Sequence, residues 1–304
     1  MSTAYSVLDV QPRSRLTRAR VALALTCAFG LGWAIVEDVF GSHLHQTYNL
    51  MQIVWTRYAV HLLIVLLLWG WHRPSRIWRT RRPAYHLLRS LMMLIMPLSF
   101  ALSLKWGAPV SFTWTIFWLA PLMVIFLAMA WHHERPSPTS WIGIVLGLFG
   151  TVAVIAPTLP ESPLAAFTPI LMALSFSVYV VMTRSLHTEA VEANLFYTAV
   201  AVFALLTLLM PSVWITPSLH DLAVMIGIGT FGFGSLLLLD HAMRYAPVSA
   251  ISPALYFQIV CVSIILMLTY GYLAPAHALI GILLIAAAVA LAWRRPIEIA
   301  RADT

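Results

Sequence analysis

The chain has 304 residues, of which 61% are hydrophobic and only 10% are charged, and its mean hydropathy is +0.87. This composition excludes a soluble globular protein of the same length, because too few polar side chains remain to face water. The net charge of +7 would suggest nucleic-acid binding in a soluble protein. In so hydrophobic a chain, the positions of the basic residues relative to the apolar stretches indicate membrane topology instead.

Ten apolar stretches follow one another along the chain, each close to the roughly 20 residues that cross about 30 Å of hydrocarbon. They cover residues 20–43, 48–71, 84–105, 108–131, 139–157, 164–184, 191–211, 219–243, 247–271 and 275–293. The connections are short, and prolines mark several of them, where a missing N–H is harmless. The sequence therefore predicts an all-α membrane protein with ten transmembrane helices.

Basic residues are concentrated on one side of this ten-span arrangement. Fifteen of the eighteen Lys and Arg residues fall in the N-terminal arm, the even-numbered loops or the C-terminal tail. Only Lys105 falls in an odd-numbered loop, while Arg57 and Arg89 lie within spans. The positive-inside rule then predicts that both termini are cytoplasmic. Topology and contact with lipid headgroups explain the arginine runs, so we expect no nucleic-acid partner.

A short internal repeat relates the two halves. The sequence APVS at 108–111 recurs 138 residues later at 246–249, and at the same offset WIGI at 141–144 returns as LIGI at 279–282. Each half holds five spans, so the two copies must have opposite orientations in the bilayer. Inverted repeats are typical of secondary transporters, with the substrate site near the midplane between the halves. The predicted parts are an N-terminal arm (1–19), a first repeat with helices 1–5 (20–157), a second repeat with helices 6–10 (164–293) and a tail (294–304).

Ionisable side chains inside the spans cost about 2.5–3.5 kcal/mol each on insertion scales and are therefore candidates for function. Arg57 lies about 13 Å deep at 1.5 Å per residue, and His61 follows one turn later on the same face. Glu37 and Asp38 lie towards the outer end of the first span. Arg57 could pair with Asp38 or Glu37 and fix the first hairpin, or it could bind a substrate carboxylate in a central cavity.

Aromatic residues form a second group of candidates. Trp114 and Trp118 are one turn apart, Tyr179 lies within the sixth span, and Tyr256 lies in the ninth with Gln258 nearby. Aromatic rings in mid-span with polar neighbours are candidates for the wall of a cavity, although such rings also serve helix packing. We assign the tryptophans near span ends to interfacial belts. These are Trp33, Trp69, Trp71, Trp131 and Trp293.

The sequence predicts neither a catalytic nor a metal site. The eleven histidines include no i,i+4 pair with a carboxylate on the same helical face. No nucleophile elbow, phosphate-binding loop or paired carboxylates occur, so we expect no cofactor and no enzymatic activity. Asp240 and Arg244 are interpreted as a structural i,i+4 pair.

Several short motifs follow one another along the chain in an order that resembles that of a known protein family. They are Asp38 late in the first span, Arg57 in the second, Arg82-Pro83 and Leu88-Arg89 at the start of the third, Pro121 and Glu134 in the fourth, then Thr183-Arg184-Ser185-Leu186, Pro217-Ser218, Tyr245-Ala246-Pro247, Pro253 and Tyr256. On these residues the chain resembles the drug/metabolite transporter superfamily, in the branch with two EamA repeats, from about residue 20 to 295. The most similar subgroup contains S-adenosylmethionine, riboflavin and metallophore carriers.

The resemblance implies a secondary transporter of the bacterial inner membrane that works by alternating access. Its expected substrates are small polar or zwitterionic metabolites, such as amino-acid-like compounds, S-adenosylmethionine, vitamins or metallophores, with export favoured over import. An importer of the same fold is the first alternative. A membrane-embedded enzyme or a structural membrane protein is the alternative from a different class. The expected partners are the substrate and the lipid bilayer.

The charge bias yields a direct prediction about topology. A reporter that is active only in the periplasm should be inactive when it is fused after Thr304, because the fifteen basic residues retain the C-terminus in the cytoplasm. An active fusion would contradict the predicted ten-span orientation.

Overall fold

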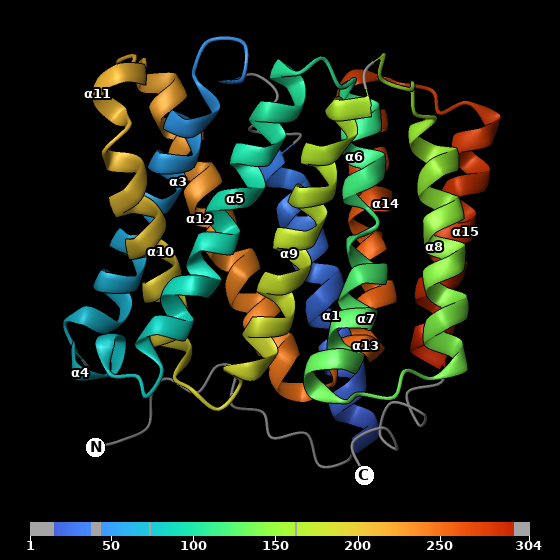
Figure 1. Cartoon of the computed structure of the whole chain (residues 1–304), viewed down its shortest axis with the longest axis horizontal. Helices are drawn as coiled ribbons and strands as arrows, with labels where there is room; N and C mark the ends of the chain where they lie inside the picture. The colour runs from blue at the N-terminus through green and yellow to red at the C-terminus, as the bar shows by residue number, and fades with distance from the viewer. Residues whose placement is uncertain (1–14, 38–43, 73, 162, 295–304) are drawn as a thin grey trace.

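The computed structural model describes residues 15–37, 44–72, 74–161 and 163–294, and this part of the chain is helical and contains no strand (Figure 1). Among the described residues, nine helices are long and apolar enough to cross a membrane, and Val191–Thr207 is a tenth apolar helix of 17 residues. The ten predicted spans are confirmed.

The first repeat consists of α1 (Arg15–Ala34, in a span that continues to Glu37), α3 (Leu50–Val65) with η2 (Leu66–Gly70), α5 (Pro83–Lys105), α6 (Val110–Phe117) with α7 (Ala120–His132), and α8 (Pro138–Ile155). The second repeat consists of α9 (Phe167–Ser185), α10 (Val191–Thr207), α12 (Leu219–Tyr245), α13 (Val248–Ile251) with η4 (Ser252–Tyr256) and α14 (Phe257–Tyr270), and α15 (Ala276–Arg294). The short connecting helices are α4 (Pro74–Trp78), η3 (Pro163–Ala166) and α11 (Met210–Val213).

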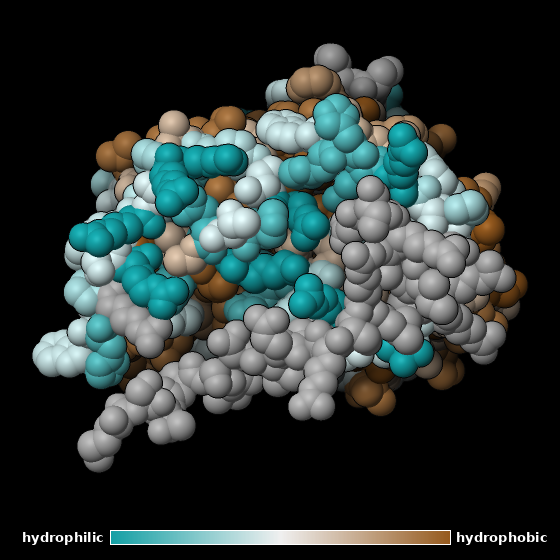
Figure 2. All heavy atoms as spheres, turned by 90° about the horizontal axis from the view of Figure 1, so that it is seen from below, coloured by the Kyte–Doolittle hydropathy of each residue, from teal (hydrophilic) through white to brown (hydrophobic). Residues whose placement is uncertain are grey.

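The two ends of the helical bundle differ in character. In Figure 1, α1 begins and α15 ends at the lower face, which also carries α4. Hydrophilic side chains gather on this face, while the flanks of the molecule are hydrophobic (Figure 2). Large apolar side chains on those flanks are exposed, as a surface in contact with lipid requires. The positive-inside rule predicts the lower face to be cytoplasmic, so it is called the inner face below and the opposite one the outer face.

Helix packing follows the symmetry of an inverted repeat. Exchanging the repeats makes α1 equivalent to α9, α3 to α10, α5 to α12, α7 to α14 and α8 to α15. The contact between α1 and α12 then corresponds to the contact between α9 and α5. In the same way, the contact between α3 and α12 corresponds to that between α10 and α5, and the contact between α1 and α14 corresponds to that between α9 and α7. The pairs α8–α15 and α3–α10 also pack together, and each is its own counterpart. In Figure 1, α1 rises from the inner face, whereas α9 descends towards it.

Glycines permit the close approach of α8 and α15. A Cβ atom on Gly150 would lie 2.7 Å from the carbonyl oxygen of Gly281, and one on Gly281 would lie 2.5 Å from that of Gly150. Small residues allow helix backbones to approach in this way inside a membrane. Gly143 and Gly147 face Pro253 and the ring of Tyr256 in the same manner. The glycines of α8 thus let this helix pack closely against the second repeat.

Two spans are interrupted at equivalent positions. The fourth span breaks at Trp118 and Leu119, between α6 and α7, and the ninth span contains the 3₁₀ segment η4. Pro121 and Pro253 lack an N–H, so each leaves the carbonyl four residues earlier without its helical donor. Trp118 and Tyr256 are one repeat offset apart, and the Tyr256 hydroxyl donates to the Trp118 carbonyl at 3.1 Å. Discontinuous helices at the interface of two repeats are where secondary transporters place their substrate.

A carboxylate joins the two repeats at the inner face. Glu134, at the end of α7, accepts hydrogen bonds from the backbone N–H groups of Val248 (3.1 Å) and Ser249 (2.8 Å) at the start of α13. The residue one repeat offset later is Tyr272, which has no carboxylate and lies on the outer side. At this pair of equivalent positions, a carboxylate joins the repeats at the inner face and a tyrosine stands at the outer face.

Candidate functional site

A cavity of about 420 Å³ lies between the repeats and reaches the outer face. Its walls come from α1, α3, α5, α6, α8, α9, α12, α14 and α15. Its rim includes His45, Tyr272 and Ala274 from segments that connect helices at the outer face. Burial lowers the pKa of the His45 imidazole, which is therefore neutral at pH 7 and adds no charge to the rim. The volume is within the range of small-molecule sites, about 300–1,000 Å³.

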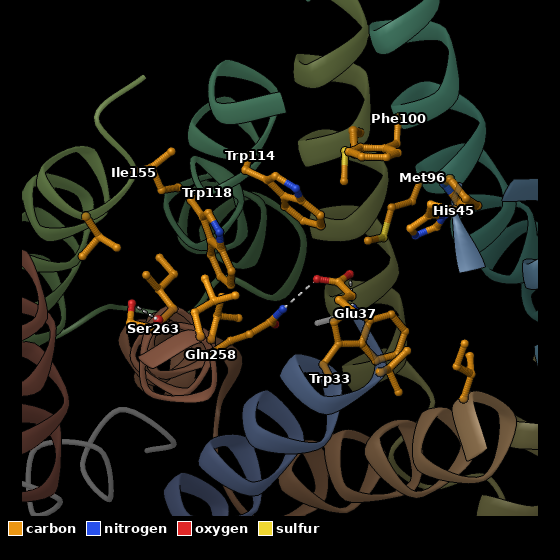
Figure 3. A pocket seen from close by; sticks show the side chains of 18 of the residues that line it. Trp33, Glu37, His45, Met96, Phe100, Trp114, Trp118, Ile155, Gln258 and Ser263 are labelled. Carbon is orange, nitrogen blue, oxygen red and sulfur yellow. Dashed lines mark hydrogen bonds between the residues drawn. The ribbon is translucent and has the colours of Figure 1, made fainter. Parts of the chain in front are cut away.

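Glu37 is the acidic group of this cavity. Its carboxylate accepts a hydrogen bond from the Trp33 indole N–H at 2.8 Å and one from the Gln258 amide at 3.3 Å. Figure 3 shows Glu37 between Trp114 and Trp118 on one side and Met96 and Phe100 on the other, with Trp33 beside it. Trp33 precedes Glu37 by one helical turn and therefore lies on the same face. The bond to Gln258 joins the first repeat to the second across the site.

Arg57 is the basic group. Its guanidinium carbon lies 5.1 Å from the centre of the Trp33 ring and 4.8 Å from that of the Tyr58 ring, so two ring faces stabilise the charge. Gly232 of α12 makes room for this side chain, since a Cβ atom there would lie 3.2 Å from the Arg57 Cδ. Among the described residues, no carboxylate forms an ion pair with Arg57.

Aromatic rings form the wall opposite these charges. Trp114 packs against Phe100 (ring centres 5.5 Å apart), and Phe117 packs against both Trp114 (5.5 Å) and Trp118 (5.3 Å). Trp114 lies in α6, and Trp118 lies one helical turn later, at the break between α6 and α7. Both side chains line the cavity. Such a wall can stack on a flat ring or a cation of a bound molecule.

An aromatic floor closes the cavity on its inner side. A second cavity of only about 10 Å³ lies beside it, with Trp33, Trp118 and Gln258 in common. Phe176 of α9 lies there with its ring centre 5.5 Å from that of Phe117 and 6.5 Å from that of Phe29. This second space holds no more than about one water molecule. The site is therefore accessible from outside and closed towards the inner face.

Five of the predicted site residues line this cavity, namely Glu37, Arg57, Trp114, Trp118 and Gln258. Three others are buried outside it: His61 packs between Tyr58 and Phe233, Tyr179 faces Arg89, and Tyr256 supports the Trp118 backbone. Asp38 lies outside the described residues, so its predicted pairing with Arg57 stays a prediction. The alternative pairing with Glu37 is not made in this structure, because the Glu37 carboxylate bonds Trp33 and Gln258 instead.

The assignment of Trp33 to an interfacial belt was wrong. Its side chain is only 4% exposed and lines the cavity between Glu37 and Arg57. The one-turn spacing to Glu37 was the available signal. Met96 and Phe100 also line the cavity, but nothing in an apolar helix distinguishes them from residues that face lipid. Within the described ranges, no group of three or more His, Cys, Asp or Glu residues could hold a metal ion.

The inverted helical repeats and the cavity at their interface define a membrane protein built like a secondary transporter. Residues 20–156 match the EamA-like transporter family. S-adenosylmethionine uptake transporters are similar over most of the chain. The protein from Rickettsia bellii is 24% identical over 77% of this chain and 83% of its own length, and that from Rickettsia conorii is 25% identical over 76% and 81%. A solved crystal structure shares the fold, with a TM-score of 0.74 and 21% identity over 94% of this chain and 99% of that one.

Residues 20–156 thus form an EamA-family domain, and the chain as a whole is similar to S-adenosylmethionine carriers. The resemblance inferred from the sequence motifs is confirmed. The apolar helices and the similarity to transporters support a multi-pass membrane protein.

The packing of α12 on α3 gives a prediction with a matched control. A Cβ atom on Gly229 would lie 3.1 Å from the Arg57 carbonyl oxygen and would collide with Val60, whereas one on Gly234 would meet nothing within 4 Å. Gly229→Ala should therefore displace α3 and its arginine, at a cost of about 1–3 kcal/mol, and should lower both the unfolding temperature and transport. Gly234→Ala should leave both unchanged or raise the unfolding temperature, because alanine favours helix. Equal behaviour of the two variants would contradict the packing described.

Proposed function

We propose that this protein transports a small zwitterionic metabolite that carries a carboxylate, a cationic group and a flat ring, and that S-adenosylmethionine is the first candidate. The observation that carries the proposal is the presence of Arg57 and Glu37, of opposite charge, in one cavity with tryptophan walls. The names of the relatives point to the same substrate.

Arg57 is suited to the carboxylate of such a substrate. A guanidinium presents two parallel N–H donors that match a carboxylate, and it stays charged at any physiological pH. The described part of the chain offers Arg57 ring faces and no ion pair, and a substrate carboxylate would supply an anion there. A carboxylate that approaches from the outer opening would therefore meet a cation that is already positioned by Trp33 and Tyr58.

Glu37 and the rings suit the remainder of the substrate. A carboxylate that is held by an indole and an amide can attract an ammonium or sulfonium group, and the nearby face of Trp33 adds a cation–π contribution. Trp114 and Trp118 can stack on a flat base such as adenine. The three groups of the substrate would thus contact three different walls of one cavity.

Alternating access would carry the substrate across. One repeat would move relative to the other around the fixed site, so that the aromatic floor opens as the outer rim closes. The sequence contains no Walker motif, so flux would follow the gradients of the substrate and any coupled ion. The resemblance of the sequence motifs favours export, whereas the relatives are named uptake transporters. We propose uptake, because the cavity faces outward.

The test is flux of labelled S-adenosylmethionine into proteoliposomes that contain the purified protein. Arg57→Lys keeps the charge but loses the planar fork, so transport should fall on the order of tenfold while the protein still inserts. Arg57→Ala should fall further, on the order of 10- to 150-fold, as loss of a charged hydrogen bond of about 1.5–3 kcal/mol implies.

Two controls make the result specific. Arg76→Ala removes an arginine that is half exposed on α4 and should leave flux unchanged. The amount of folded, detergent-extracted protein separates a lost ligand from lost structure. Absence of S-adenosylmethionine flux in the wild type, or normal flux in Arg57→Ala, would refute the proposed function.

A further inference from the structure

A second arginine is buried in the closed, inner half of the protein. Arg89 of α5 is 1% exposed, and its guanidinium donates to the Thr183 hydroxyl (3.1 Å), the Thr198 hydroxyl (2.8 Å) and the Asn194 carbonyl (2.5 Å). The guanidinium carbon also lies 5.1 Å from the centre of the Tyr179 ring. All four partners are neutral, although a buried cation is expensive without an anion.

The acidic residue in the same hydrogen-bond network is already engaged. Asp240 accepts from the Asn194 amide at 2.6 Å and pairs with Arg244 at 3.1 Å, which confirms the predicted i,i+4 pair. The negative charge of Asp240 is therefore matched by Arg244 rather than by Arg89. Within the described residues, Arg89 forms no ion pair, and its Nε atom has no partner.

Arg57 and Arg89 lie at equivalent helix contacts, although non-equivalent helices carry them, because α3 corresponds to α10 and α5 to α12. Arg57 lies where α3 packs with α12, over a ring of α1, and Arg89 lies where α5 packs with α10, over a ring of α9. Exchange of the repeats converts the helices α1, α3 and α12 into α9, α10 and α5. In each group the guanidinium carbon is 5.1 Å from an aromatic ring on the first helix of a repeat, Trp33 or Tyr179.

Polar side chains continue inward from Arg57. Arg57 lies over the ring of Tyr58, and His61 stacks on Tyr58 with ring centres 5.9 Å apart. The Tyr58 hydroxyl and the Nε2 atom of His61 are buried and have no hydrogen-bond partner in the described part of the chain. Polar groups this deep in a membrane protein face one another or a pathway.

We propose that Arg89 is a second carboxylate-binding residue, which contacts the carboxylate of the substrate when the protein faces inward. In an inverted-repeat transporter the two halves exchange their roles between states. The group α1–α3–α12 lines the open cavity now, so the equivalent group α9–α10–α5 lines the cavity that opens inward. The proposal rests on the proposed function, because it assumes a substrate with a carboxylate.

A sided transport assay tests the role of Arg89. Wild type and Arg89→Gln are compared for the half-saturating concentration on each side of the membrane, with S-adenosylmethionine and its decarboxylated analogue as probes. Arg89→Gln should raise the inner half-saturating concentration of S-adenosylmethionine on the order of tenfold, with the outer value unchanged. The decarboxylated analogue should be unaffected, as should both probes in the exposed control Arg76→Gln. If Arg89→Gln does not fold, Arg89→Lys keeps the charge without the planar fork and should show the same one-sided shift.

A labelling experiment tests, without any substrate, whether a cavity opens at Arg89 from the inner side. Thr198 contacts Arg89 and is fully buried in this structure. In a background with Cys27→Ala and Cys261→Ala, Thr198→Cys should react with a membrane-impermeant maleimide from the inner side as the protein opens. Thr198→Cys that is never labelled from inside would overturn the proposal, as would an Arg89→Gln defect that is equal on both sides and for both probes. A wild type that carries no S-adenosylmethionine would refute the proposed function alone, and the labelling would still decide whether an inner cavity opens at Arg89.

Discussion

A backbone carbonyl that loses its helical donor inside a bilayer must find another donor within the protein, because lipid offers none. Pro121 creates this situation in the fourth span and Pro253 in the ninth. At the break, the Tyr256 hydroxyl donates to the Trp118 carbonyl and the Ser177 hydroxyl donates to the Ala120 carbonyl. Both donors come from the second repeat and both acceptors belong to the first. Hydrogen bonds from the second repeat thus stabilise the backbone of the first repeat beside the break at Pro121.

The position of the site follows from this constraint. The break places Trp118 in the wall of the outer cavity, and the ring of Tyr256 packs behind it on the glycine face of α8. The charges are then held by contacts that cross the repeat boundary, since Gln258 bonds Glu37 and Gly232 makes room for Arg57. A rearrangement of the two repeats must therefore change the surroundings of both charges. This coupling is what alternating access requires.

Much of this architecture could be predicted from the sequence. Ten apolar stretches and the repeat offset determine the spans and their inversion, and the cost of a charge in a membrane singles out Arg57. Neighbours from distant helices could not be predicted, because spacing along one helix does not show which helix it faces. Glu37 was one of two carboxylates considered as partners of Arg57 in the same hairpin, yet it bonds Gln258, which is 221 residues away. The similar surroundings of Arg57 and Arg89 likewise depend on the packing of α5 with α9 and α10, which spacing along a single helix does not show.

The state of the protein depends on an asymmetry between its two faces. Glu134 bonds two backbone N–H groups of the opposite repeat at the inner face, and Tyr272 occupies the equivalent position at the outer face. The carboxylate thus stabilises inner closure, while the outer cavity remains open. Phe176 lines the small closed cavity, and Ser252, one turn after Val248, is fully buried.

The most direct measurement is the rate at which Ser252→Cys, in a background without Cys27 and Cys261, reacts with an impermeant maleimide from the inner side. Removal of the contact by Glu134→Ala should raise this rate on the order of tenfold, because a charged hydrogen bond contributes about 1.5–3 kcal/mol. The same change at Glu161, an exposed carboxylate in an outer loop, should have no effect. An unchanged rate in Glu134→Ala would contradict the account of two repeats that close the inner side against each other around a central site.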